Sequence, residues 1–124
     1  MSYDVFFQGF VAGESSGHRW GRMRNVVAPH VSAQAGAWLQ VRFGDGDADL
    51  YLSEDGMMAN HISGRAPWQL LVTGARAANW VILPLDRPAC LTVPGQREEL
   101  PEERADGAVF VESGADLLKL IMID

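Results

Sequence analysis

Three polar side chains between residues 61 and 65 are the strongest candidates for chemistry in this chain. His61, Ser63 and Arg65 follow a predicted strand and precede a predicted helix. Loops at strand ends often carry binding sites, and a helix N-terminus attracts anions. These residues therefore predict a site for an anion or a small molecule, enzymatic or not. The competing interpretation is structural: Ser63 caps locally, Arg65 is solvated and His61 alternates on a strand.

A second group of polar residues surrounds a predicted turn. Asp45, Asp47 and Asp49 alternate as the first ligands of a helix–loop–helix calcium site do. The rest of that pattern disagrees, because Leu50 stands where glycine is required and Gly56 stands where a bidentate glutamate is required. We therefore expect a solvated hairpin turn and no metal site.

The only cysteine, Cys90, excludes an internal disulfide. A nucleophilic cysteine needs a base and an electropositive setting, but the nearby charges are Asp86 and Arg87, with no histidine close in the sequence. We expect Cys90 to be a small buried hydrophobe; its proximity to His61 in space stays open. The sequence contains no nucleophile elbow, phosphate-binding loop or dinucleotide fingerprint, so we expect no cofactor.

The distribution of charge is uneven along the chain. Residues 1–42 hold four arginines and two carboxylates, whereas residues 43–124 hold six basic residues and fourteen carboxylates, so the formal charges are +2 and −8. The most acidic run spans residues 96–106 and contains five carboxylates against Arg97 and Arg104: Glu98, Glu99, Glu102, Glu103 and Asp106. It is either a solvated segment or a docking surface for a basic partner. The net charge of −6 argues against nucleic acid as a ligand.

These features lead to three predictions of function. The first is a non-enzymatic protein-binding module, with an acidic bacterial inhibitor or immunity-type protein as one concrete form and the acidic run as its contact face. The second is the small-molecule or anion site at His61, Ser63 and Arg65. The third is a structural subunit that forms a homo-oligomer through a sheet edge or an exposed tryptophan, although the four tryptophans are expected mainly in the core.

The first half of the chain predicts an antiparallel meander behind an N-terminal strand. Residues 3–11 are aromatic and β-branched and form that strand, and residues 18–28 have the apolar spacing of a helix. Three strands joined by tight turns follow, at 37–43, 49–52 and 57–62. The stretch between Pro29 and Gly36 stays open between a loop and a short helix.

The second half predicts alternating helices and strands, as in a crossover unit. The expected helices lie near 67–78, 94–100 and 113–121, and the expected strands near 80–85, 89–92 and 108–112. Residues 80–85 are apolar throughout, which indicates a strand covered on both faces. Gly74 is expected to let its helix pack closely on the sheet.

Together these elements predict one α+β domain over residues 1–124: a mixed, mostly antiparallel sheet with two to four helices packed on it. A chain of 124 residues fits a single domain. No apolar run approaches the roughly 18 residues of a membrane-spanning helix, and the N-terminus lacks the basic region of a signal peptide. We therefore expect a cytoplasmic protein without a membrane partner.

Overall fold

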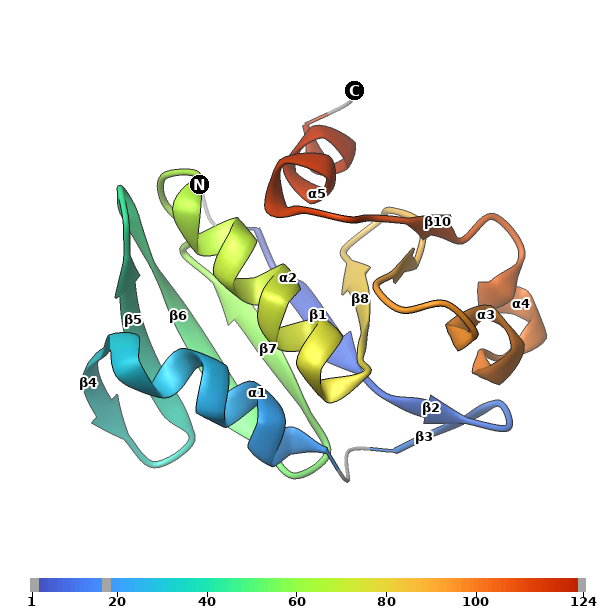
Figure 1. Ribbon diagram of the computed structural model, residues 1–124, viewed down its shortest axis with the longest axis horizontal. Coiled ribbons are helices and arrows are strands. Elements are labelled where there is room, and N and C mark those ends of the chain that lie inside the picture. Colours follow the sequence, from blue (N-terminus) through green and yellow to red (C-terminus); the bar gives the residue numbers. More distant parts are fainter. Residues whose placement is uncertain (1–2, 17–18, 123–124) are drawn as a thin grey trace.

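One large sheet organises the molecule, as the computed structural model shows for residues 3–16 and 19–122. Eight strands are bonded in the order β10-β9-β8-β1-β7-β6-β5-β4. Their bounds are β1 Val5–Gln8, β4 Val31–Ala35, β5 Trp38–Phe43, β6 Gly46–Ser53, β7 Gly56–Asn60, β8 Val81–Pro84, β9 Cys90–Leu91 and β10 Val109–Phe110. Figure 1 shows helices packed on this sheet. The predicted α+β fold is confirmed.

The helices and a small hairpin complete the inventory of the described residues. The hairpin pairs β2 with β3 as a separate two-stranded sheet. The bounds are α1 Trp20–Val27, α2 Ala66–Ala78, α3 Gln96–Glu99, α4 Glu102–Ala105, α5 Gly114–Ile121, a 3₁₀ turn Ala28–His30, β2 Phe10–Val11 and β3 Glu14–Ser15. None of the helices in these residues has the length and apolar character needed to span a membrane.

The sheet is antiparallel except at one edge. Strands β5 to β7 form the predicted meander, and β4 adds an antiparallel edge strand that was not predicted. Strand β1 lies between β7 and β8, antiparallel to both. Strand β8 is antiparallel to β9. Among the described strands, only β9 and β10 run parallel, and the connection between them contains α3 and α4. The expected crossover is therefore confined to this last pair.

Three local differences from the sequence expectations have clear causes. The predicted N-terminal strand breaks at Gly9, after which the chain enters the β2–β3 hairpin. The stretch left open before Gly36 contains edge strand β4, whose small residues give no apolar alternation but pair with β5. The helical turns near residue 100 are two helices, because Pro101 lacks the backbone N–H needed to continue α3.

The main core lies between one sheet face and the helices α1, α2 and α5. Figure 1 shows α1 and α2 side by side over the strands, and their buried residues join Val5, Phe7 and Leu50 in one cluster. A Cβ built on Gly74 would lie 2.3 Å from the Sδ atom of Met23 in α1. Gly74 therefore allows close packing on α1; the expectation of close packing on the sheet was wrong, because α1 lies directly against this part of α2.

A smaller core lies on the opposite sheet face. Side chains alternate between the two faces of a strand, so Ile82 joins the main cluster while its neighbour Val81 joins the second. Helices α3 and α4, with the turns around them, cover this second cluster, which contains Val81, Ala89, Leu91, Leu100 and Ala108. No residue of β1, β7 or β6 belongs to this second cluster, so α3 and α4 cover this sheet face only as far as β8. On the same face, Phe6 of β1 is 42% exposed and Tyr51 of β6 is 40% exposed.

Candidate functional site

The structure brings the two polar groups of the sequence into contact with each other. The imidazole Nδ1 of His61 lies 3.0 Å from Oδ2 of Asp49. The Ser63 hydroxyl donates a 2.8 Å hydrogen bond to Asp47 and accepts one of 3.1 Å from the Asp47 backbone N–H. The third aspartate, Asp45, lies against the backbone of residues 65 and 66. We call this arrangement the aspartate ladder: three alternating carboxylates of the β5–β6 hairpin bound to the segment that follows β7.

Asp45 caps helix α2 from a distant turn. Its carboxylate accepts hydrogen bonds from the backbone N–H of Arg65, at 3.0 and 3.1 Å, and from that of Ala66, at 2.8 Å. These are N–H groups that the first turn of a helix leaves unsatisfied. The bond from Ala66, followed by that from Arg65, holds the pKa of Asp45 below its ordinary value. The chain's own carboxylate thus lies where the sequence predicted a bound anion.

A close backbone approach brings the hairpin to the 61–66 segment. A Cβ built on Gly46 would lie only 1.8 Å from the carbonyl oxygen of Ser63. In addition, the backbone N–H of Ser63 donates a 2.8 Å bond to the carbonyl of Asp47. Position 46 thus needs a residue without a side chain if the ladder is to close.

The ladder gives His61, Ser63 and Arg65 structural contacts and does not assemble them into a catalytic set. The Ser63 hydroxyl donates to Asp47, so His61 does not serve as its base in this arrangement. The His61 side chain is 63% exposed, and the other two residues are exposed as well. Ser63 bonds to the hairpin, not to its own helix. The small-molecule site at these residues therefore stays a prediction.

Cys90 is a buried thiol in the main core. It is fully inaccessible to solvent, and its Sγ–H donates weakly to the carbonyl of Pro88 at 3.5 Å. Burial raises the pKa of Cys90 to about 12, which keeps it protonated at neutral pH and unsuited to nucleophilic attack. Among residues 3–16 and 19–122, no three side chains of His, Cys, Asp or Glu converge as metal ligands.

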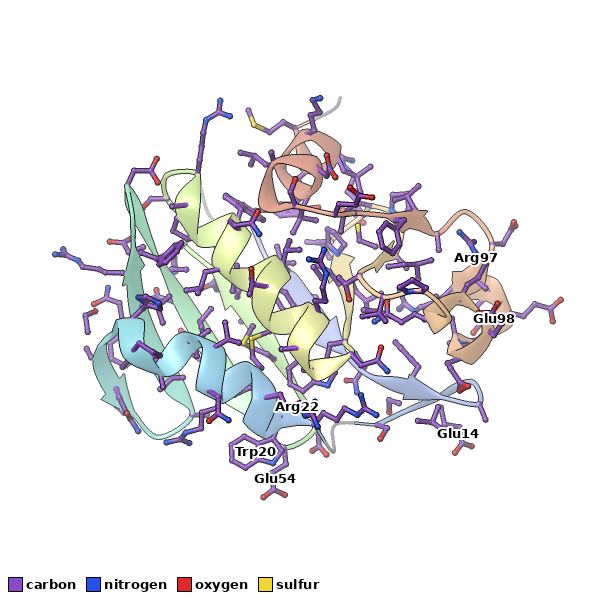
Figure 2. The ribbon with its side chains drawn as sticks, in the orientation of Figure 1. Glu14, Trp20, Arg22, Glu54, Arg97 and Glu98 are labelled. Carbon is purple, nitrogen blue, oxygen red and sulfur yellow. The ribbon has the colours of Figure 1, made fainter. Side chains whose placement is uncertain are left out.

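The acidic run forms an exposed surface on the α3–α4 unit. Figure 2 shows Arg97 and Glu98 together at this end of the molecule, whereas Glu54 lies at the turn between β6 and β7. We define the acidic segment as its four exposed carboxylates, Glu98, Glu102, Glu103 and Asp106. Glu99 is half-buried and differs from them, because its carboxylate accepts a 2.6 Å bond from the backbone N–H of Ala12. Glu99 thus anchors the β2–β3 hairpin.

Two side chains that the sequence analysis did not identify hold the acidic segment in place. The guanidinium of Arg97 donates to the carbonyls of Ala105, at 2.7 Å, and Ala108, at 2.8 Å. The buried amide of Gln96 accepts a 2.7 Å bond from the backbone N–H of Thr92 and donates a 3.0 Å bond to the side chain of Asn79. Buried amides are normally satisfied in this way, but the spacing of the sequence gives no sign that Gln96 points inward.

The fold and surface together define an α+β domain with an ordered acidic segment at one end. Comparisons with protein-family models, with curated proteins and with solved structures found no match to this chain. The case for a function therefore rests on the chain's own residues.

Proposed function

We propose that this protein is a non-enzymatic binding module that captures a basic partner protein through the acidic segment. The observation that carries the proposal is the exposure of its four carboxylates on an anchored surface: Glu98, Glu102, Glu103 and Asp106. Carboxylates gathered on one surface attract a cationic partner and speed its association. An acidic inhibitor or immunity-type protein is one concrete form of this module.

The anchoring of the acidic segment supports this proposal. Ordering a loop on binding costs free energy, but Arg97 and Gln96 already attach the segment to the body of the domain. The rigid segment therefore presents its charges without that additional cost. Within the same proposal the protein acts in the cytoplasm, where a buried, reduced thiol such as Cys90 is stable.

The test compares three tagged baits in lysate of the source organism at low and moderate salt. The baits are the natural chain, Glu98→Lys/Glu102→Lys in the acidic segment, and Glu54→Lys/Glu112→Lys outside it, which changes the net charge equally. Captured proteins are identified by mass spectrometry, and binding is then repeated with the purified partner. Equal charge changes at the two locations separate a specific surface from a general effect of net charge.

We expect one basic protein to bind the natural chain and the Glu54→Lys/Glu112→Lys bait, and to be lost from Glu98→Lys/Glu102→Lys. Retention should weaken as the salt concentration rises, because screening shortens the reach of exposed charges. Equal capture by all three baits, or capture that is insensitive to salt, would contradict the proposal.

A further inference from the structure

An apolar row crosses the sheet face opposite α1 and α2. The strand register places Trp38 opposite Tyr51, Tyr51 opposite Met58, Met58 opposite Phe6, and Phe6 opposite Leu83. The flanking neighbours of these residues, such as Leu50 and Val5, are buried on the other face. Because faces alternate along every strand, the five side chains lie in one line across β5, β6, β7, β1 and β8.

The row forms the floor of a groove. A hollow of about 550 Å³ is lined by Phe6, Tyr51, Met58 and Leu83 of the row, with Phe10 and Arg104 among the residues around them. A second hollow of about 530 Å³ shares Phe6, Leu83 and Arg104 and continues toward Leu85, which is 51% exposed. An exposed apolar groove with polar residues at its rim is one mark of an interaction site.

The groove begins where the second core ends. Leu83 packs partly against the cluster beneath α3 and α4, whereas Phe6 and Tyr51, farther along the row, are 42% and 40% exposed. On the other face of the sheet, buried residues of α1, α2 and α5 join strand residues in the main core cluster. A sheet with an apolar face is stable when another layer covers that face, and residues 3–16 and 19–122 supply that layer for one end of this face only.

The charges beside the row are mainly negative. Asp49 lies two residues before Tyr51 on β6, and Asp4 lies two residues before Phe6, so both are on the same face as the row. Asp55 lines the groove itself. The Asp49 carboxylate accepts a 3.3 Å bond from the Trp38 indole N–H, so the N–H edge of the Trp38 ring points toward Asp49. The second hollow adds Asp86, and the cations in the groove wall are Arg87 and Arg104. Four carboxylates thus stand against two guanidinium groups around the row. Arg104 belongs to α4, whose neighbouring residues Glu102 and Glu103 are part of the acidic segment.

We propose that this groove receives an amphipathic helix of a basic partner protein, with its apolar face on the row and its Lys or Arg side chains at the carboxylates. The inference rests on the proposed function, because it assigns the partner of the acidic segment a second contact on the adjoining surface. A helix presents apolar anchors at every third or fourth residue and lies in an apolar groove by that face. Such a helix adds the missing layer and brings cations to Asp4, Asp49 and Asp55.

A second copy of this chain fits the groove less well. If two copies met through this face, the carboxylates of Asp4 and Asp49 from both copies would lie in the same interface. Like charges in an interface cost several kcal/mol. A basic helix turns the same carboxylates into favourable contacts. Charge complementarity therefore selects a basic partner over self-association.

The experiment measures the affinity of the full chain for two fluorescein-labelled peptides of about 15 residues, a length that supports a helix. Both peptides carry leucine at helical spacing; one has lysine at the flanking positions and the other has glutamate. Anisotropy titrations compare the natural chain with Phe6→Thr and Tyr51→Thr in the groove and Phe110→Thr outside it. Phe110 is 46% exposed on β10 and is the matched control. Threonine suits a strand, and circular dichroism checks that each variant is folded.

We expect the lysine peptide to bind the natural chain and Phe110→Thr within about twofold of each other, and the two groove variants at least about tenfold more weakly. The glutamate peptide should bind at least about tenfold more weakly than the lysine peptide. Failure of the lysine peptide to bind, or equal binding to Phe6→Thr and Phe110→Thr, would overturn the inference. So would a dimer of the natural chain in sedimentation that Phe6→Thr makes monomeric, because the face would then belong to a second copy.

The groove and the acidic segment can fail separately. If Glu98→Lys/Glu102→Lys abolishes partner capture while Phe6→Thr binds the peptides as well as the natural chain does, the proposed function stands and the groove inference is wrong. If the groove variants weaken peptide binding while the charge-reversed bait still captures its partner, the groove inference stands and the acidic segment is not the contact.

Discussion

The carboxylate of Asp45 accepts a 2.8 Å hydrogen bond from the backbone N–H of Ala66, the first residue of α2. A hairpin turn thus caps a helix that begins twenty-one residues later in the chain. The contact links two elements that the sequence presents as independent, the β5–β6 hairpin and α2. It also fixes the register in which Asp47 and Asp49 meet Ser63 and His61.

The cap makes stability depend on pH in a defined direction. The pKa of Asp45 is lowered in the folded chain by its bonds from Ala66 and Arg65. Its contribution is therefore fully present above the ordinary value of 3.8 and is lost as the pH falls through the lower folded-state pKa. We expect Asp45→Asn to be less stable than the natural chain at pH 6, with the difference closing as the pH falls below 3.8. Urea unfolding at a series of pH values measures this difference.

The control for this measurement is Asp55→Asn. Asp55 is exposed in the β6–β7 turn, and no backbone N–H at the start of a helix is bonded to its carboxylate in the described structure. We expect no comparable closing of the stability difference for this variant. A constant difference between Asp45→Asn and the natural chain at every pH would show that the ionised cap does not contribute.

Gly46→Ala tests the close approach that allows the ladder to form. The added methyl group would lie 1.8 Å from the Ser63 carbonyl oxygen, so the hairpin and the 61–66 segment must separate. Overpacking of this kind costs about 1–3 kcal/mol, and denaturant unfolding should show a loss in that range. In contrast, Gly21→Ala has open space in helix α1 and should gain up to about 1 kcal/mol. A neutral Gly46→Ala would mean that the ladder is looser than the structure indicates.

Local patterns were sufficient to predict most of the fold. The meander followed from alternation and turn residues, and α2 followed from Pro67 and its apolar spacing. Strand β8 is covered on both faces, as its continuous apolar run indicated, because Ile82 joins the main core cluster and Val81 joins the second. Edge strand β4 could not be predicted in this way, because its small side chains carry little pattern and its pairing with β5 defines it.

The contacts of the candidate residues could be predicted only in part. The sequence identified Asp45, Asp47 and Asp49 and, separately, His61 and Ser63, but no local pattern states that the two groups pair. The apolar row could not be predicted either, because Phe6, Tyr51 and Leu83 come from strands whose order is set by long-range pairing. Such relationships depend on register, which a single sequence leaves open.

Cys90 should be unreactive in the folded chain. Its side chain is buried and its pKa is raised to about 12, so neither access nor the thiolate is available at pH 8. We expect Ellman's reagent to react with the folded chain at least about a thousandfold more slowly than with the urea-unfolded chain. Ser32→Cys, at an exposed position on β4, places a second thiol that should react at once. Rapid reaction of both thiols in native buffer would contradict the burial of Cys90.

Gln96→Ala should loosen the acidic segment without touching its charges. The substitution leaves the buried N–H of Thr92 without the acceptor that Gln96 provides, which costs about 1–3 kcal/mol. It also removes the bond to Asn79 at the end of α2. Hydrogen exchange should become faster across residues 96–106, whereas Gln34→Ala, on exposed edge strand β4, should leave that exchange unchanged. If binding of a basic partner depends on an anchored segment, Gln96→Ala should also weaken capture although every carboxylate remains. Unchanged exchange at 96–106 would mean that the contacts of Arg97 and Glu99 hold the segment in place without Gln96.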